Sequence, residues 1–355
     1  MATADPAQHL RALSPSAANR LPPHWPHRAA SRFVAAGGLT WHVQIFEGQG
    51  QPETGSAGEG GRPGETHAKG ETSETSETRE TSGTSGTCGS GGAGAESEGA
   101  GWDIVLLHGT GASAHSWRDI APALARRLPP GARVIAPDLP GHAFTGRPPD
   151  EGLSLPGMAR LLCALLQVLQ ARPRVLIGHS AGAAVAARMA LDDPADVKTL
   201  VSLNGAWLPP AGQGRWFYAP LARLFALNPW VPRVFAFHAS HRGPLERLLA
   251  STGSRLDRPG IDLYARLVSD RRHVAAVLAM MTAWDLRPLL QDLHRLAPAL
   301  HLVVSESDLT VPPRTSEEAA RRLPHAVLHR LPGLGHLAHE EAPAVVLELL
   351  DRLLT

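Results

Sequence analysis

The chain has 355 residues, of which 43% are hydrophobic, and its formal net charge is +1. This length supplies enough apolar material for one large core, or for one core with a small accessory domain. The arginines are scattered and form no dense basic run, which argues against a nucleic-acid-binding protein.

The N-terminus lacks the apolar core of a signal peptide, and no stretch reaches the roughly 18 uncharged apolar residues of a membrane span. Two cysteines, Cys88 and Cys163, are too few for a disulfide framework, which indicates a reducing compartment. These features predict a cytoplasmic protein.

The N-terminal third alternates between polar and β-forming segments. Residues 1–21 are polar and Ala-rich, which predicts disorder. Residues 22–48 hold two short β-type runs around Gly37 and Gly38, which predicts a hairpin of the core. Residues 49–100 have low complexity and almost no large apolar residue, so they cannot offset their ordering entropy. We expect a disordered insertion between two strands rather than an interdomain linker, because one hairpin could not form a domain alone.

From Trp102 onward, apolar strands alternate with helix-length segments. The predicted strands are 103–109, 132–138, 174–180, 197–205, 300–307 and 326–333. Near-continuous Val, Ile and Leu runs are typical of parallel strands covered on both faces. The alternation predicts an α/β fold, with a doubly wound, mostly parallel sheet formed by residues 101–205 and 286–355. Residues 206–285 interrupt it with aromatic and proline residues, which predicts a helical lid.

The strongest motif is the G-x-S-x-G pattern at residues 178–182, which follows an apolar strand and opens an Ala-rich helix. In this context the pattern predicts a nucleophile elbow with Ser180 at its tip. Glycines two residues before and after the serine leave room for a strained turn. The helix N-terminus then favours negative charge that develops beside Ser180.

An oxyanion hole needs two backbone N–H donors. One comes from the residue after the nucleophile, Ala181, and the second from the loop that ends the first strand of the αβ alternation. In this loop, the sequence His-Gly-Thr-Gly at 108–111 makes Thr110 the candidate, because glycines on both sides let the backbone approach a substrate oxygen.

The base and the acid should follow in the order Ser, Asp, His. His336 lies in the Gly-rich loop after the last strand and is the predicted general base. His339 is its rival, but its position beside Glu340 at the start of a helix predicts a surface residue. Asp308 lies just past a strand end and is the predicted acid that orients the imidazole, with Glu306 as the alternative.

Other candidate residues lie outside this set. Trp117 and the lid aromatics Trp207, Trp216 and Phe237 are candidates for a substrate pocket, although such residues are as often part of a core. His238-x-x-His241 has the spacing of a ligand pair but lacks a third ligand nearby. We therefore expect neither a metal nor a cofactor.

The motifs HGTG, GHSAG, DLTVPP and GLGH resemble those of the α/β-hydrolases over residues 102–355. More narrowly, WPHRAASRFVAAGGLTWHVQ (25–44), HGTGASAHSWRDIAP, APDLPGHAFTGRP and LSLPGMARLL resemble the magnesium chelatase accessory proteins of bacteriochlorophyll biosynthesis. The chain departs from these relatives in the insertion at 49–100, where they have a short turn. It also has Ala143 where a glycine is usual.

The resemblance implies the α/β-hydrolase fold with a helical lid, and a role in a pigment pathway. The first hypothesis is a serine hydrolase acting on an ester or related acyl bond of a small molecule, with a tetrapyrrole or its ester as a plausible substrate. Ser180 disfavours the aspartate-nucleophile chemistry of other hydrolases, whereas C–C bond hydrolysis stays open. The second is a non-catalytic accessory protein that binds a tetrapyrrole and passes it to magnesium chelatase. Membrane contact through the apolar run at 215–237 is possible but not expected.

Overall fold

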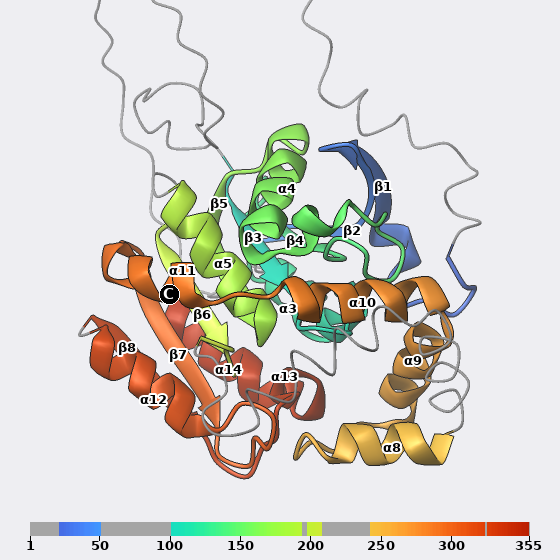
Figure 1. Cartoon of the computed structure of the whole chain (residues 1–355). Coiled ribbons are helices and arrows are strands. Elements are labelled where there is room, and N and C mark those ends of the chain that lie inside the picture. Colours follow the sequence, from blue (N-terminus) through green and yellow to red (C-terminus); the bar gives the residue numbers. More distant parts are fainter. Residues whose placement is uncertain (1–20, 51–100, 194–196, 208–241, 324, 355) are drawn as a thin grey trace, which may run out of the picture.

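Eight strands form one sheet in the described part of the chain, in the order β1-β2-β4-β3-β5-β6-β7-β8 (Figure 1). The computed structural model describes residues 21–50, 101–193, 197–207, 242–323 and 325–354. The pairs β1–β2 and β2–β4 are antiparallel. Every other pair of neighbouring strands in this sheet is parallel. The predicted doubly wound, mostly parallel sheet is therefore confirmed.

The strands end within two residues of their predicted bounds. They are β1 (Ser31–Ala36), β2 (Leu39–Glu47), β3 (Asp103–Leu107), β4 (Arg133–Pro137), β5 (Pro173–His179), β6 (Thr199–Leu203), β7 (Ala299–Ser305) and β8 (Ala326–Leu331). The α-helices are α3 (Ile120–Ala125), α4 (Leu155–Val168), α5 (Ala181–Asp192), α8 (Arg242–Ala250), α9 (Arg258–Ser269), α10 (Arg271–Ala283), α11 (Arg287–Asp292), α12 (Pro313–Arg322), α13 (Ala338–Glu341) and α14 (Pro343–Leu354). The short 3-10 helices are η1 (Arg28–Ala30), η2 (Ala114–Trp117), η3 (Asp150–Leu153) and η4 (Leu293–Arg295).

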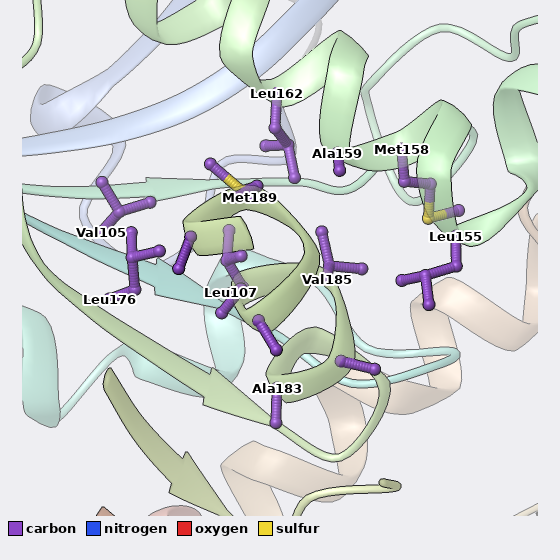
Figure 2. Close-up of a cluster of buried hydrophobic side chains, with 14 of the residues drawn as sticks. Val105, Leu107, Leu155, Met158, Ala159, Leu162, Leu176, Ala183, Val185 and Met189 are labelled. Carbon is purple, nitrogen blue, oxygen red and sulfur yellow. The ribbon is translucent and has the colours of Figure 1, made fainter. Parts of the chain in front are cut away.

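Both faces of the sheet are covered, and β3 shows how its sequence achieves this. Val105 and Leu107 point into a cluster with α4 and α5, whereas Ile104 and Leu106 point into the opposite cluster with α3 and α14. Figure 2 shows the first cluster, where side chains of α4 and α5 converge on β3 and β5. Because alternate side chains of a strand face opposite sides, an uninterrupted apolar run buries both faces.

The carboxyl ends of the parallel strands lie along one edge of the sheet, where α/β proteins bind ligands. The loops after β3, β5, β6, β7 and β8 all open at this edge. Three helices of the predicted lid segment, α8, α9 and α10, follow β6 in the chain, and Figure 1 shows them at one side of the sheet. Residues 208–241 of that segment lie outside the described residues.

Two details differ from the expectations. Leu21 was assigned to the disordered N-terminal segment, but its side chain is buried against Leu263 and Leu267 of α9. Gln49 and Gly50 were assigned to the insertion, yet both donate backbone hydrogen bonds to residues 125–128. Residues 1–20 and 51–100 otherwise lie outside the described residues.

The reduced state expected of the two cysteines stays a prediction. Cys163 lies on α4 with an exposed fraction of 9%. Cys88 lies outside the described residues. A search of the described helices finds none that is both long and apolar enough to cross a bilayer.

Candidate active site

Ser180 lies at the junction of β5 and α5 with φ 51° and ψ −118°, a conformation that an L-residue rarely adopts. Its N–H donates to the carbonyl of Leu203 at 3.0 Å. Its own carbonyl accepts from the N–H groups of Ala183 and Ala206, each at 3.1 Å. The neighbouring strand and helix therefore hold the strained backbone in place.

The two glycines of the motif are required by contact distances. A Cβ at Gly178 would lie 2.4 Å from the Cα of Ala183, and a Cβ at Gly182 would lie 2.3 Å from the carbonyl oxygen of Leu107. Because these neighbours are backbone atoms, they cannot move aside without disturbing α5 or β3. The G-x-S-x-G pattern thus follows from the close approach of β3, β5 and α5.

Asp308 and His336 lie together as predicted. The Oδ2 of Asp308 is 2.7 Å from Nδ1 of His336, and both side chains are almost fully buried. The other carboxylate oxygen, Oδ1, accepts the N–H groups of Thr310 and Val311, each at 2.8 Å. These two amides fix the carboxylate, so that it can orient the imidazole ring. Glu306, the alternative acid, is exposed.

The loop of His336 is fixed to the elbow by two side chains that the sequence analysis missed. Nε2 of His179, the residue before Ser180, donates to the carbonyl of His336 at 2.9 Å. The amide nitrogen of Asn204 donates to the same carbonyl at 2.9 Å, and its oxygen accepts the N–H of Ser305 at 2.8 Å. Asn204 lies near the carboxyl end of the predicted strand 197–205 and directly follows β6, just as Asp308 follows the predicted strand 300–307, and this position was the available signal.

A turn after α8 supports both the acid loop and the base loop. The carbonyl of Thr252 accepts the N–H groups of Leu309 and His336, each at 3.2 Å. The hydroxyl of Ser254 accepts the N–H of Leu337 at 2.8 Å. One short segment between the lid helices therefore fixes the relative position of the Asp308 and His336 loops.

The loop after β3 lies against the elbow. A Cβ built on Gly109 would be 3.1 Å from Cβ of Ser180. Nδ1 of His108 donates to the carbonyl of Gly109 at 2.8 Å, and the N–H of Ala112 donates to it at 3.2 Å. Since C=O and N–H point in opposite directions across a trans peptide, the N–H of Thr110 faces away from these donors. Thr110 itself is exposed.

His108 is held neutral and in one tautomer. While Nδ1 donates to Gly109, Nε2 accepts the N–H of Leu139 at 2.8 Å. Complete burial is the main cause that lowers the pKa of His108 to about 3, with the neighbouring His142 as a second cause. The imidazole is therefore an uncharged crosslink between the loops after β3 and β4.

His339 is the clearest disagreement with the sequence analysis. It was expected at the surface, but its ring is buried between those of Trp117 and His179, with centroid distances of 4.6 and 4.5 Å. The adjacent Glu340 is buried too, and it accepts hydrogen bonds from the hydroxyl of Tyr264 and the guanidinium of Arg118. These contacts bury α13, the short helix that follows His336.

The candidate pocket aromatics lie in other places. Trp117 is fully buried among apolar residues packed against α3 and α14. Trp207 is also fully buried, and its Nε1 donates to the hydroxyl of Ser202 at 2.7 Å. The structure thus places both in the core rather than at a pocket surface. Trp216 and Phe237 lie outside the described residues.

Metal binding has no support in the described residues, where no group of three or more His, Cys, Asp or Glu side chains could hold an ion. His238 and His241 lie outside these residues. A carboxylate, an imidazole, a strained serine and two backbone N–H groups, those of Thr110 and Ala181, are what this part of the site offers chemically.

Comparisons with known proteins place the chain among hydrolases. Residues 104–349 match the model of the alpha/beta hydrolase family. The magnesium-chelatase 30 kDa subunit of Rhodobacter capsulatus is 41% identical over 240 residues, which cover 67% of this chain and 82% of that protein. The uncharacterized hydrolase YugF of Bacillus subtilis is 27% identical over 252 residues, which cover 69% of this chain and 87% of that protein.

Solved structures agree on the fold. The epoxide hydrolase CorEH superposes with a TM-score of 0.64 at 19% identity, covering 91% of this chain and 97% of that one. An esterase from Thermogutta terrifontis superposes with a TM-score of 0.55 at 23% identity, covering 72% and 90% of the two chains.

Proposed function

Because the chain belongs to the alpha/beta hydrolase family, we propose that it is a serine hydrolase that cleaves an ester or related acyl bond. Ser180 is the nucleophile, His336 the general base and Asp308 the residue that orients the base. The observation that carries this proposal is the buried 2.7 Å hydrogen bond between Asp308 and His336, in a loop anchored to the elbow of Ser180.

In the first step, Nε2 of His336 removes the hydroxyl proton of Ser180, and Oγ attacks the acyl carbon of the substrate. Asp308 accepts a hydrogen bond from Nδ1–H of His336, which leaves Nε2 as the basic nitrogen, and its charge stabilises the imidazolium that forms. The carbonyl oxygen becomes an oxyanion, for which the N–H groups of Thr110 and Ala181 are the proposed donors.

The tetrahedral intermediate then collapses. Its C–O bond to the leaving group breaks, His336 returns the proton to the departing alcohol, and the acyl group stays on Ser180. A water molecule, deprotonated by His336, attacks the acyl-enzyme and releases the acid. The neutral His108 fits this scheme, because it orients the Gly109–Thr110 peptide without adding a charge beside the oxyanion.

The substrate class follows from the relative rather than from the geometry. The magnesium-chelatase subunit name of the 41% identical protein supports a place in the pathway to bacteriochlorophyll. We therefore propose a tetrapyrrole or its ester as the small-molecule substrate, and magnesium chelatase as a partner. The same relative supports a second candidate function, a non-catalytic protein that binds a tetrapyrrole for the chelatase.

Labelling with a fluorophosphonate tests the proposal, because this reagent reacts with an activated serine. The native chain should be labelled and Ser180→Ala should not. Ser31→Ala is a matched control, since Ser31 lies 3.0 Å from Nε2 of His42, whose Nδ1 is 2.8 Å from Asp138. This second Ser–His–Asp chain begins at a β-strand rather than a helix N-terminus, so Ser31→Ala should keep the label.

Turnover of a small activated ester gives the mechanistic test. Ser180→Ala and His336→Ala should each lower kcat by about 10⁴-fold or more, and the double variant should be scarcely worse, because both disable one step. Asp308→Asn should also be severely impaired, since the amide favours the wrong tautomer of His336. Undiminished turnover by Ser180→Ala contradicts the mechanism. An inert native chain whose tetrapyrrole binding survives Ser180→Ala supports the second candidate.

A further inference from the structure

A histidine of the lid segment contacts the loop that carries the proposed oxyanion donor. Nε2 of His273, on α10, is 3.2 Å from the carbonyl oxygen of Gly111. Its Nδ1 is 3.0 Å from the backbone nitrogen of Ala143, in the loop after β4. The side chain is buried, so water does not compete for either hydrogen bond.

These two contacts fix the tautomer of His273. A carbonyl only accepts and a backbone N–H only donates, so Nε2 carries the proton and Nδ1 is the acceptor. Burial lowers the pKa of His273 to about 4, which keeps the ring in this neutral form near neutral pH. His108 shows the opposite tautomer, with its proton on Nδ1.

The tip of the oxyanion loop, at Thr110 and Gly111, has little packing of its own. Gly111 adopts φ +78°, and a Cβ built there would meet no atom within 4 Å. Thr110 is exposed. The peptide that carries the Thr110 N–H is instead fixed by hydrogen bonds, because His108 and the N–H of Ala112 both donate to the carbonyl of Gly109. His273 donates to the carbonyl of Gly111, which lies in the same peptide as the Ala112 N–H.

α10 also packs tightly on the loop after β4. A Cβ at Gly141 would lie 2.7 Å from Cβ of Ala276, one helical turn after His273. α10 is thus held against this loop at two points, Ala276 on Gly141 and His273 on Ala143. A shift of α10 would withdraw the donor from Gly111 at the same time.

We infer that His273 is a positioning residue for the oxyanion loop, through which the docking of α10 sets the direction of the Thr110 N–H. This inference deepens the proposed function and rests on it for its catalytic consequence. The lid segment then does more than cover the substrate, because one of its helices completes the oxyanion hole. Hydrolysis requires α10 in its docked position.

Three substitutions at one position test the inference. His273→Ala loses both hydrogen bonds, His273→Asn can keep only the acceptor near Nδ1, and His273→Gln can keep the donor near Nε2. We expect His273→Ala and His273→Asn to lower kcat of ester turnover by about 10- to 100-fold with KM changed less than about 3-fold. His273→Gln should stay within about 5-fold of the native kcat.

A destabilised control separates positioning from folding. Ile104→Val removes one buried methylene near the amino end of β3, at the edge of the sheet opposite the active site, and should lower stability by about 1 kcal/mol. Its kcat should equal that of the native chain. Equal kcat values for His273→Asn, His273→Gln and the native chain would overturn the inference.

Hydrogen exchange supplies a readout that does not depend on activity. In His273→Ala, the amides of residues 109–113 should exchange faster than in the native chain or in Ile104→Val. Unchanged exchange there overturns the inference even if activity falls. A native chain that neither turns over ester nor takes up fluorophosphonate contradicts the proposed function. Faster exchange in His273→Ala would even then support the positioning role of His273 in the loop.

Discussion

Positive φ angles at non-glycine residues concentrate at the edge of the sheet that carries the candidate site. Ser180, Asn204 and Ala143 have φ of 51°, 47° and 43°, and each follows a strand or lies in the loop after one. Such conformations cost of order 1 kcal/mol and persist only where surrounding contacts fix them. At Ser180 and Asn204 the backbone direction presents a side chain to the site, which explains why strain is tolerated there.

Ala143 differs, because its methyl group has no such role. The resemblance noted from the sequence implies glycine at this position, and the N–H of Ala143 donates to Nδ1 of His273. Ala143→Gly should relieve the left-handed strain, partly offset by the greater freedom of glycine in the unfolded chain. We expect a gain in the free energy of unfolding of about 0.5 kcal/mol, measured by urea denaturation. A loss of stability would show that the methyl group packs against Phe144 or Trp25.

Local rules predicted Ser180, Asp308 and His336, because each follows a strand and lies in a recognisable loop. The same rules failed for His339. Its neighbour Glu340 suggested a solvated face, but Arg118 and Tyr264, which lie far away in sequence, bury the pair. A charged residue is almost never buried unless it is paired, and a sequence does not show which pairs will form.

At the scale of elements, the strands were predictable because their Val, Ile and Leu runs have no other stable place than a sheet covered on both faces. The contacts that support the site could not be predicted in this way. The carbonyl of Thr252 reaches the N–H groups of Leu309 and His336, and His273 reaches Gly111, across long separations in the chain. Such contacts depend on how α8 and α10 dock, which no local pattern encodes.

The insertion gives a prediction for a whole segment. Gly48 and Gly50 bond to the loop at residues 128–132, and Gly101 packs on Gly131 of that same loop. Both ends of the insertion therefore meet at one place. Deleting residues 51–100 and joining Gly50 to Gly101 through a short turn should leave the melting temperature within about 5 °C of the native value.

The boundary of that deletion can be tested as well. Removing Gln49 and Gly50 in addition would delete two backbone hydrogen bonds to Ala125 and Leu128. The longer deletion should therefore melt at a lower temperature than the shorter one. A fall of more than about 5 °C for the shorter deletion would show that residues 51–100 contribute to the folded state.

At the scale of the whole molecule, several histidines around the site are buried and held neutral. Burial is the largest cause that lowers the pKa of His108, His142 and His339 to about 3 and of His273 to about 4. An unfolded chain exposes these rings to water, where their pKa returns to about 6.5. At pH values between the folded and the unfolded pKa of these rings, the unfolded state binds more protons than the folded state.

This difference predicts a steep loss of stability in mild acid. Because the folded pKa values are depressed, the stabilisation is complete above pH 6.5 and is lost as pH falls towards 4. Each such histidine should remove about 2 kcal/mol from the free energy of unfolding between pH 7 and pH 5. The combined loss is comparable with the total stability of a domain, so the chain should unfold near pH 5.

Urea denaturation across this pH range measures the slope, and a substitution identifies its source. His339→Leu replaces an imidazole whose two nitrogens have no hydrogen-bond partner in the described structure with an apolar side chain of similar size. It should reduce the proton uptake on unfolding at pH 5 by about one proton, because one titrating ring is gone. Ile104→Val, which destabilises the core without removing a titratable group, should leave the uptake unchanged. If His339→Leu unfolds along the native pH profile, the buried rings are not the origin of the acid sensitivity. If the free energy of unfolding depends less steeply on pH in His339→Leu than in the native chain and the control, the acid sensitivity originates in the buried histidines around the active site.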